Sequence, residues 1–92
     1  MNEIDATDDV NTIDARFLEQ YRKGLEGISH ERALAKTRRT LRKIRSGPRG
    51  IEKHLAKLKY AKYPTGLERE IRALRRKETA LEQLIKELEG RS

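Results

Sequence analysis

The sequence predicts an all-α protein, a small bundle of about four helices whose last helix is long and follows a heptad pattern. Three observations support this. From residue 13 onward apolar residues recur every three or four positions, which is the spacing of one helix face. Charged residues make up 40% of the chain and aromatic residues only 4%, a composition typical of long helices with a narrow apolar seam. Glycine and proline mark or weaken the ends of the periodic stretches.

The 92 residues suffice for one small domain, which the composition divides into three regions. Residues 1–10 are expected to form a flexible acidic tail, because they hold too few large apolar side chains to offset the entropy of ordering. Residues 11–64 form a basic helical region. Residues 65–90 form a long amphipathic or coiled-coil helix.

The first helix is predicted from five apolar residues that share one face: Ile13, Phe17, Tyr21, Leu25 and Ile28. Thr12 or Asn11 is the expected N-cap. Gly24 and Gly27 weaken the end of this helix.

The second helix is expected to begin after Ser29, a typical N-cap residue. Leu34, Leu41 and Ile44 form its apolar stripe, and it should end where Gly47 adopts the left-handed cap conformation.

A third helix follows, with Pro48 in its first turn. Its short stripe consists of Ile51, Leu55 and Leu58, and Pro64 stops it.

The last helix has the clearest start, because residues 65–68 (TGLE) form a capping-box pattern directly after a proline. Its heptad stripe predicts a coiled coil and a homodimer through six residues: Leu67, Ile71, Leu74, Leu81, Ile85 and Leu88. Glu78 is the polar exception in this stripe. Bases concentrate in residues 69–77 and acids in 78–89, so parallel and antiparallel pairing both remain open. The alternative is that the stripe packs inside its own chain.

Groups for catalysis are scarce, so no enzyme is expected. The chain has no cysteine and two histidines. His30 lacks the second histidine of a zinc helix, His54 stands among lysines, and no Gly-Lys-Ser/Thr follows the glycines. We therefore expect no cofactor, no metal and no small-molecule substrate.

The expected compartment is the cytoplasm. No apolar run approaches the roughly 18 residues that span a bilayer, and the N-terminus is acidic instead of showing the basic and apolar regions of a signal peptide. The apolar face of residues 30–45 is also weak for insertion into a membrane surface. No membrane partner is expected.

The middle of the chain is strongly basic. Residues 30–63 hold twelve lysines and arginines against only two acids, Glu31 and Glu52. At helical spacing, Arg32, Lys36, Arg39 and Lys43 line one face, while Arg38, Arg42 and Arg45 line another. Like charges at these spacings repel, and a helix that is merely solvated is expected to mix signs. The pattern therefore favours a polyanionic partner over a solvated face, and its charges would stand on two helices that meet at a turn.

The predicted nucleic-acid-binding residues are Arg32, Lys36, Arg38, Arg39, Arg42, Lys43, Arg45, Arg49, Lys53, Lys57 and Lys62. Arginine outnumbers lysine five to two in residues 32–45, which suits bidentate contacts to phosphate. Tyr60 and Tyr63 stand among lysines, where they could stack on bases. The simpler alternative is that they cover the small core.

Residues 16–44 resemble the start of the N-terminal SAM-like core-binding domain of tyrosine recombinases and integrases. The matching pieces are Phe17-Leu18, Gly27-Ile28-Ser29 and the stretch RRTLRKI at 38–44. The resemblance implies an all-helical module that clamps duplex DNA. It implies phosphate contacts for Arg38, Arg39, Arg42 and Lys43. The catalytic constellation of that family is not found, and no recombinase activity is expected.

The sequence therefore predicts a small basic nucleic-acid-binding protein that neutralises phosphates, with DNA favoured over RNA. The rival hypothesis is a coiled-coil adaptor or assembly subunit that docks an acidic partner. For the nucleic-acid hypothesis, the acidic tail could compete for the same basic surface as an intramolecular polyanion.

Overall fold

A computed structural model describes residues 13–90, which form four helices and no strand. The helices are α2 (Ala15–Gly24), α3 (His30–Ser46), α4 (Ile51–Leu58) and α5 (Thr65–Gly90). The predicted all-α class, with a long last helix, is confirmed for these residues. The expected acidic tail and the two expected N-cap residues, Asn11 and Thr12, lie outside the described part of the chain.

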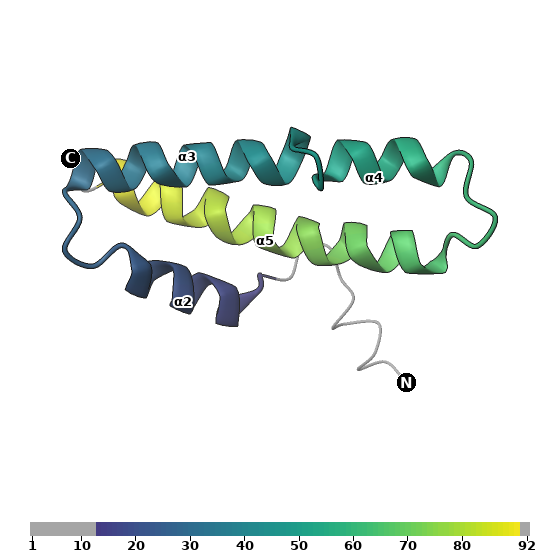
Figure 1. The fold of residues 1–92 in the computed structure, drawn as a ribbon. Helices are drawn as coiled ribbons and strands as arrows, with labels where there is room; N and C mark the ends of the chain where they lie inside the picture. Colours follow the sequence, from purple (N-terminus) through teal and green to yellow (C-terminus); the bar gives the residue numbers. More distant parts are fainter. Residues whose placement is uncertain (1–12, 91–92) are drawn as a thin grey trace.

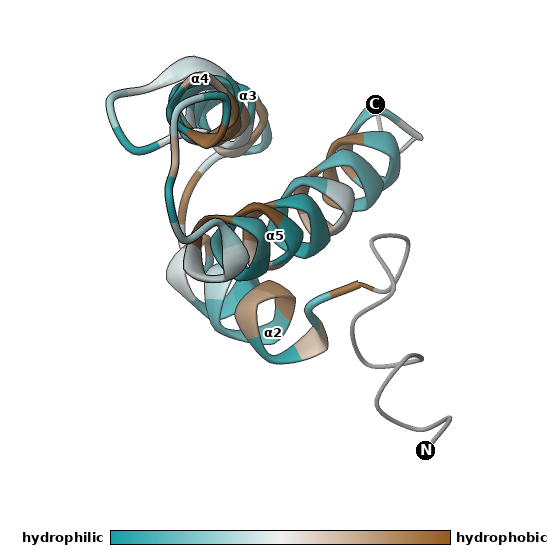
Figure 2. Ribbon diagram, turned by 90° about the vertical axis from the view of Figure 1, so that its right-hand side faces the viewer, coloured by the Kyte–Doolittle hydropathy of each residue, from teal (hydrophilic) through white to brown (hydrophobic). Residues whose placement is uncertain are grey.

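The central helix of the fold is α5, because each of the other three packs against it. Helices α3 and α4 follow one another along a single line, and α5 runs back beside both of them (Figure 1). In the view along the molecule α3 and α4 overlap, and α2 lies on the other side of α5 (Figure 2). The break at residues 47–50 therefore forms no corner, and the bases of α3 and α4 stand on one extended rod.

The first helix begins at an acidic cap. The Asp14 carboxylate accepts a hydrogen bond from the Phe17 amide at 3.0 Å, so Asp14 is the N-cap of α2. The loop after α2 contains Gly27, the one residue with positive φ (81°) within residues 13–90, a conformation that favours glycine. Ser29 caps α3 as predicted, since its hydroxyl accepts from the Arg32 amide at 3.3 Å.

The linker between α3 and α4 corrects two predictions. Gly47 is extended (φ −74°, ψ 177°) and not left-handed. Glycine is needed there because a Cβ on Gly47 would lie 2.5 Å from the Lys43 carbonyl oxygen, and one on Gly50 would lie 2.8 Å from the same atom. Pro48 lies in the linker and not in the first turn of α4, which begins at Ile51.

The long helix begins near its predicted start. The Glu68 amide donates to the Pro64 carbonyl at 2.9 Å, so Thr65 is the first helical residue and not the cap. The preceding helix already ends at Leu58, earlier than the expected stop at Pro64.

The core is a seam between α5 and its three neighbours. Its main cluster contains Leu18, Ala33, Ala80, Leu84 and Leu88. On α3 the small residues Ala33 and Thr37 are buried. The buried Thr37 hydroxyl has a hydrogen-bond partner, because it donates to the Ala33 carbonyl at 2.7 Å. Small side chains at this contact let two helix backbones approach closely.

The heptad stripe of α5 contributes to this core. Ile71, Leu81 and Leu88 are buried, while Leu67, Leu74 and Ile85 are half-buried. Packing inside the same chain, the alternative to a coiled-coil dimer, therefore accounts for at least half of the stripe. Among residues 13–90, no helix has the length and apolar character needed to cross a bilayer.

Candidate nucleic-acid interface

All eleven bases predicted to bind nucleic acid have exposed side chains, but the fold distributes them over different surroundings. The helical spacing of α3 places them on both sides of the buried seam formed by Ala33, Thr37 and Leu41. One side faces the acidic half of α5, and the other does not. The two sides therefore differ in the charge they can offer a polyanion.

Two of the predicted arginines pair with α5. Arg38 donates from Nη2 to Glu89 Oε2 at 2.6 Å. Arg45 donates from Nε to Glu78 Oε2 at 2.8 Å and also pairs with Glu82. The hydrogen bond that Arg45 donates to Glu78, supported by the charges of Glu78 and Glu82, raises the pKa of Arg45 above its usual value. To contact a phosphate, each of these two arginines would first have to release its carboxylate partner on α5.

The same contacts explain Glu78, the polar residue in the heptad stripe. Its side chain is only 14% exposed and lies between Arg45 and Arg75, with Arg75 Nη1 at 3.4 Å from Oε1. A largely buried carboxylate requires such partners. Glu78 is thus part of the α3–α5 contact.

The opposite side of α3 carries four bases that form no ion pair with any described residue. We call this set the open stripe: Arg32, Lys36, Arg39 and Lys43. Next to it, the hydroxyls of Thr40 and Tyr21 lie 2.9 Å apart in a hydrogen bond that ties α3 to α2. This bond helps to hold the open stripe in a fixed position relative to α2.

The most basic part of the molecule lies further along the rod. Because α5 runs antiparallel to α3 and α4, its basic N-terminal half lies beside α4 (Figure 1). Residues 49–77, which we call the basic end, hold ten bases against three acids, a net charge of +7. The remaining described residues, 13–48 and 78–90, hold eleven bases against eight acids, a net charge of +3. Positive charge is thus concentrated at the end formed by α4 and the start of α5.

Sequence reasoning assigned half of these bases to a different role. Of the predicted binding residues, the basic end includes Arg49, Lys53, Lys57 and Lys62. It also includes bases of α5 that had been interpreted only as part of a dimerisation helix: Arg69, Arg72, Arg75, Arg76 and Lys77. The run of bases at 69–77 was the available signal, but only the antiparallel packing shows that it adds to α4.

The two tyrosines at this end are open to solvent. Tyr60 is 89% exposed and Tyr63 is 82% exposed, so the interpretation that they cover the core is wrong. Large aromatic side chains this exposed among lysines are available for stacking on an unpaired base.

A groove connects the open stripe to the basic end. It holds about 380 Å³ and is lined by Thr40, Lys43, Ile44, Pro48, Arg49 and Leu74. A neighbouring hollow shares Arg49 and Leu74 and adds Lys57 and Glu70. Bases therefore stand around a largely apolar floor on this side of the α3–α4 rod.

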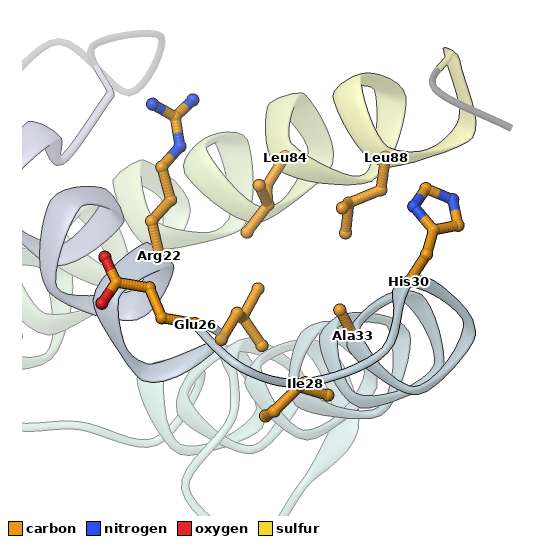
Figure 3. Close-up of a pocket in the computed structure, with 8 residues that line it drawn as sticks. Arg22, Glu26, Ile28, His30, Ala33, Leu84 and Leu88 are labelled. Atoms are coloured by element: carbon orange, nitrogen blue, oxygen red, sulfur yellow. The ribbon is translucent and has the colours of Figure 1, made fainter.

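A second hollow lies at the other end, between α2, α3 and α5 (Figure 3). Leu84 and Leu88 of α5 form its apolar wall, with Arg22 and His30 at its edge. Arg22 Nη2 is already held by the Glu87 carboxylate, at 2.6 and 2.7 Å. No cluster of three or more metal-ligating side chains occurs within the described residues. The stronger candidate site is the basic surface.

No family model, curated protein or solved structure matches this chain.

Proposed function

We propose that this protein binds nucleic acid, with duplex DNA favoured over RNA, through phosphate neutralisation. The observation that carries the proposal is the basic end, where bases from α4 and from the start of α5 add to a charge of +7. Phosphate contacts of this kind release counterions and supply most of the affinity of non-specific DNA binding.

The binding surface of the proposal runs from the basic end along the α3–α4 rod. The open stripe and Arg42 extend it, since none of these residues has an ion pair within residues 13–90. The resemblance to the core-binding domain of tyrosine recombinases supports the same region, because Arg39, Arg42 and Lys43 are among the residues for which it implies phosphate contacts. In this proposal Arg38 and Arg45 contribute less, because they are engaged by acids of α5.

Tyr60 and Tyr63 add a stacking element to the proposal. A base inside a duplex presents no free face, so they would act where a strand end or a single-stranded segment is available. Arginine supplies bidentate phosphate contacts along the rest of the surface.

The expected result is strongly salt-dependent binding. With six to ten phosphate contacts, affinity for a generic duplex should fall by about 10³ to 10⁵ between roughly 50 and 200 mM salt. Fluorescence anisotropy with a labelled duplex measures this directly, and a matched single strand and an RNA duplex test the preference. An affinity that stays flat across this salt range would contradict the proposal.

The rival function is an adaptor that docks an acidic partner protein. The groove beside Lys43 and Arg49 favours it, because its floor of Ile44, Pro48 and Leu74 suits apolar side chains. An acidic partner would also bind in a salt-dependent way, so the discriminating result is tight binding to DNA alone.

A homodimer through α5 remains part of the proposal. It would use what the fold leaves accessible on the stripe, the half-buried Leu67, Leu74 and Ile85. Sedimentation at rising protein concentration should show a mass that increases toward twice 10.7 kDa. A constant mass of one chain at the highest concentration would contradict the dimer.

A further inference from the structure

The exposed aromatic residues of this protein stand at one end of the α3–α4 rod. Tyr60 and Tyr63 follow α4 and are exposed, whereas the chain's other two aromatic residues, Phe17 and Tyr21, pack against the core. The two tyrosines belong to the basic end, whose net charge of +7 attracts a polyanion. Proteins that bind single strands combine a basic surface with aromatic side chains, because every unpaired nucleobase offers a face for stacking. This end of the rod therefore suits a single strand.

The open stripe of α3 has a different character. Its four basic residues are exposed, and residues 30–48 contain no aromatic residue. At 1.5 Å per residue, the stripe from Arg32 to Lys43 is about 17 Å long. That length matches about five phosphates along one strand of a duplex, at 3.4 Å each. A row of basic residues without aromatic side chains can contact phosphates but cannot stack on nucleobases. The stripe therefore suits a duplex, whose nucleobases are already stacked and paired.

The groove lies where these two surfaces meet. It holds about 380 Å³, a size within the range of clefts that bind small ligands. Its apolar floor consists of Ile44, Pro48 and Leu74. Lys43 and Arg49 also line it, and neither forms an ion pair within residues 13–90. An apolar floor between two cations fits a nucleobase that carries a phosphate on each side.

The hollow next to the groove gives a strand its direction. Glu70 is the one acid that lines either hollow, and its carboxylate repels phosphates. The phosphates of a strand that leaves the groove are therefore drawn from Arg49 toward Lys57, which lines the second hollow. Tyr60 is the next step along this path. Its amide donates to the Lys57 carbonyl at 3.1 Å, so Tyr60 lies about one helical turn beyond Lys57.

We propose that the substrate of this surface is a duplex that carries a single-stranded overhang. The duplex lies on the open stripe, the first unpaired nucleobase lies in the groove, and the overhang follows α4 and stacks on Tyr60 and Tyr63. This inference rests on the proposed function and names its substrate class. Eleven residues separate Arg49 from Tyr60, about 17 Å at the rise of a helix. That distance corresponds to about five stacked nucleotides, so an overhang of about six nucleotides reaches the tyrosines.

Fluorescence anisotropy with labelled DNAs of one sequence tests the substrate class. The DNAs are a blunt duplex, the same duplex with a 5′ or a 3′ overhang of about six thymidines, and the overhang strand alone. We expect one overhang duplex to bind about 25-fold more tightly than the blunt duplex. This gain corresponds to two stacked nucleobases, one in the groove and one on the tyrosines, at about fivefold each.

The outcomes separate this inference from the proposed function. Equal binding of the blunt and the overhang duplexes overturns the inference and leaves the proposed function intact. A lone strand that binds as tightly as the overhang duplex also overturns the inference, because the duplex would then contribute nothing. If none of the DNAs binds, the proposed function fails and the inference fails with it.

An abasic nucleotide in the overhang tests the groove without altering the protein. At the first unpaired position it removes the nucleobase assigned to the groove and keeps the phosphates on both sides. We expect this change to weaken binding about fivefold. The matched control is an abasic nucleotide at the third position, which should have little effect. Equal effects at the two positions would overturn the placement of a nucleobase in the groove and leave the groove to an apolar side chain of an acidic partner protein.

The variant Y60A/Y63A tests the stacking. Both side chains are exposed, so the helical content measured by circular dichroism should not change. We expect Y60A/Y63A to weaken binding to the overhang duplex about fivefold and to leave binding to the blunt duplex unchanged. Y60F/Y63F should keep the full gain, because phenylalanine still stacks. The control R32Q/K36Q should weaken binding to both duplexes by the same factor. An overhang gain that survives intact in Y60A/Y63A refutes the path along α4.

Discussion

Replacing Arg39 and Lys43 with glutamine is expected to weaken DNA binding far more than the same replacement at Arg38 and Arg45. The first pair belongs to the open stripe, whereas Glu89, Glu78 and Glu82 already engage the second pair. Each lost phosphate contact lowers the slope of log affinity against log salt by about one. We expect R39Q/K43Q to lower the slope by about two and R38Q/R45Q to lower it by less than one.

The comparison is matched in charge, since each double variant takes the net charge from +7 to about +5. A general attraction between a basic protein and DNA would therefore respond equally to both variants. The free energy of unfolding should respond in the opposite way, since the pair that matters less for binding matters more for stability. Ion pairs of an exposed arginine contribute about 0–1 kcal/mol, and Arg75 still pairs with the largely buried Glu78 when Arg45 is replaced. We therefore expect R38Q/R45Q to lower the free energy of unfolding modestly and R39Q/K43Q to leave it unchanged. Equal slopes for the two variants would show that pairing with α5 does not set the binding surface.

Local signals in the sequence located the helices well. Ser29 was identified as a cap because a hydroxyl before an amphipathic run satisfies a free amide of the first turn, and the structure contains this bond. The start of α5 at Thr65 was located by Pro64, because a helix rarely continues through a proline but can begin directly after one. These features depend on neighbouring residues only, so a single sequence contains them.

Conformations that helical spacing does not determine were harder to predict. Gly47 was expected to be left-handed, but its backbone is extended, and a Cβ there would lie 2.5 Å from the carbonyl oxygen of Lys43, one turn earlier in the chain. The alternative in which the tyrosines cover the core was wrong, because Tyr60 and Tyr63 are both more than 80% exposed. Neither fact can be derived from helical spacing, because spacing describes a face but not what lies opposite to it.

The candidate site shows the same division. Exposure of the α3 bases followed from periodicity, but the acids that pair with Arg38 and Arg45 lie more than thirty residues away. The polarised charge of the last helix was compatible with a parallel or an antiparallel neighbour. Once α5 is seen to run antiparallel to α3 and α4, its acids meet α3 and its bases join α4. Helix direction thus decides which bases remain open.

Replacing Leu81 with alanine is expected to destabilise the fold by about 2–5 kcal/mol, because the side chain is fully buried and its removal leaves a cavity. A domain of this size has about 5–15 kcal/mol in total, so a large share of its stability would be lost. Chemical denaturation followed by circular dichroism measures the loss as a lower midpoint.

The matched control is Leu55 of α4, which is 40% exposed. Both changes replace leucine with alanine inside a helix, so the intrinsic helix preference cancels, and the difference reports burial alone. We expect Leu55→Ala to cost less than about 1 kcal/mol.

The Leu81→Ala experiment also separates the two roles considered for the heptad stripe, packing within one chain and packing across a dimer. If Leu81 packs within its own chain, the loss of stability caused by Leu81→Ala is the same at every protein concentration, whether or not the half-buried residues of the stripe form a dimer. If Leu81 packs across a dimer, Leu81→Ala abolishes the rise of the midpoint with protein concentration. Because the seam encloses Leu81 completely within one chain, we expect the first result.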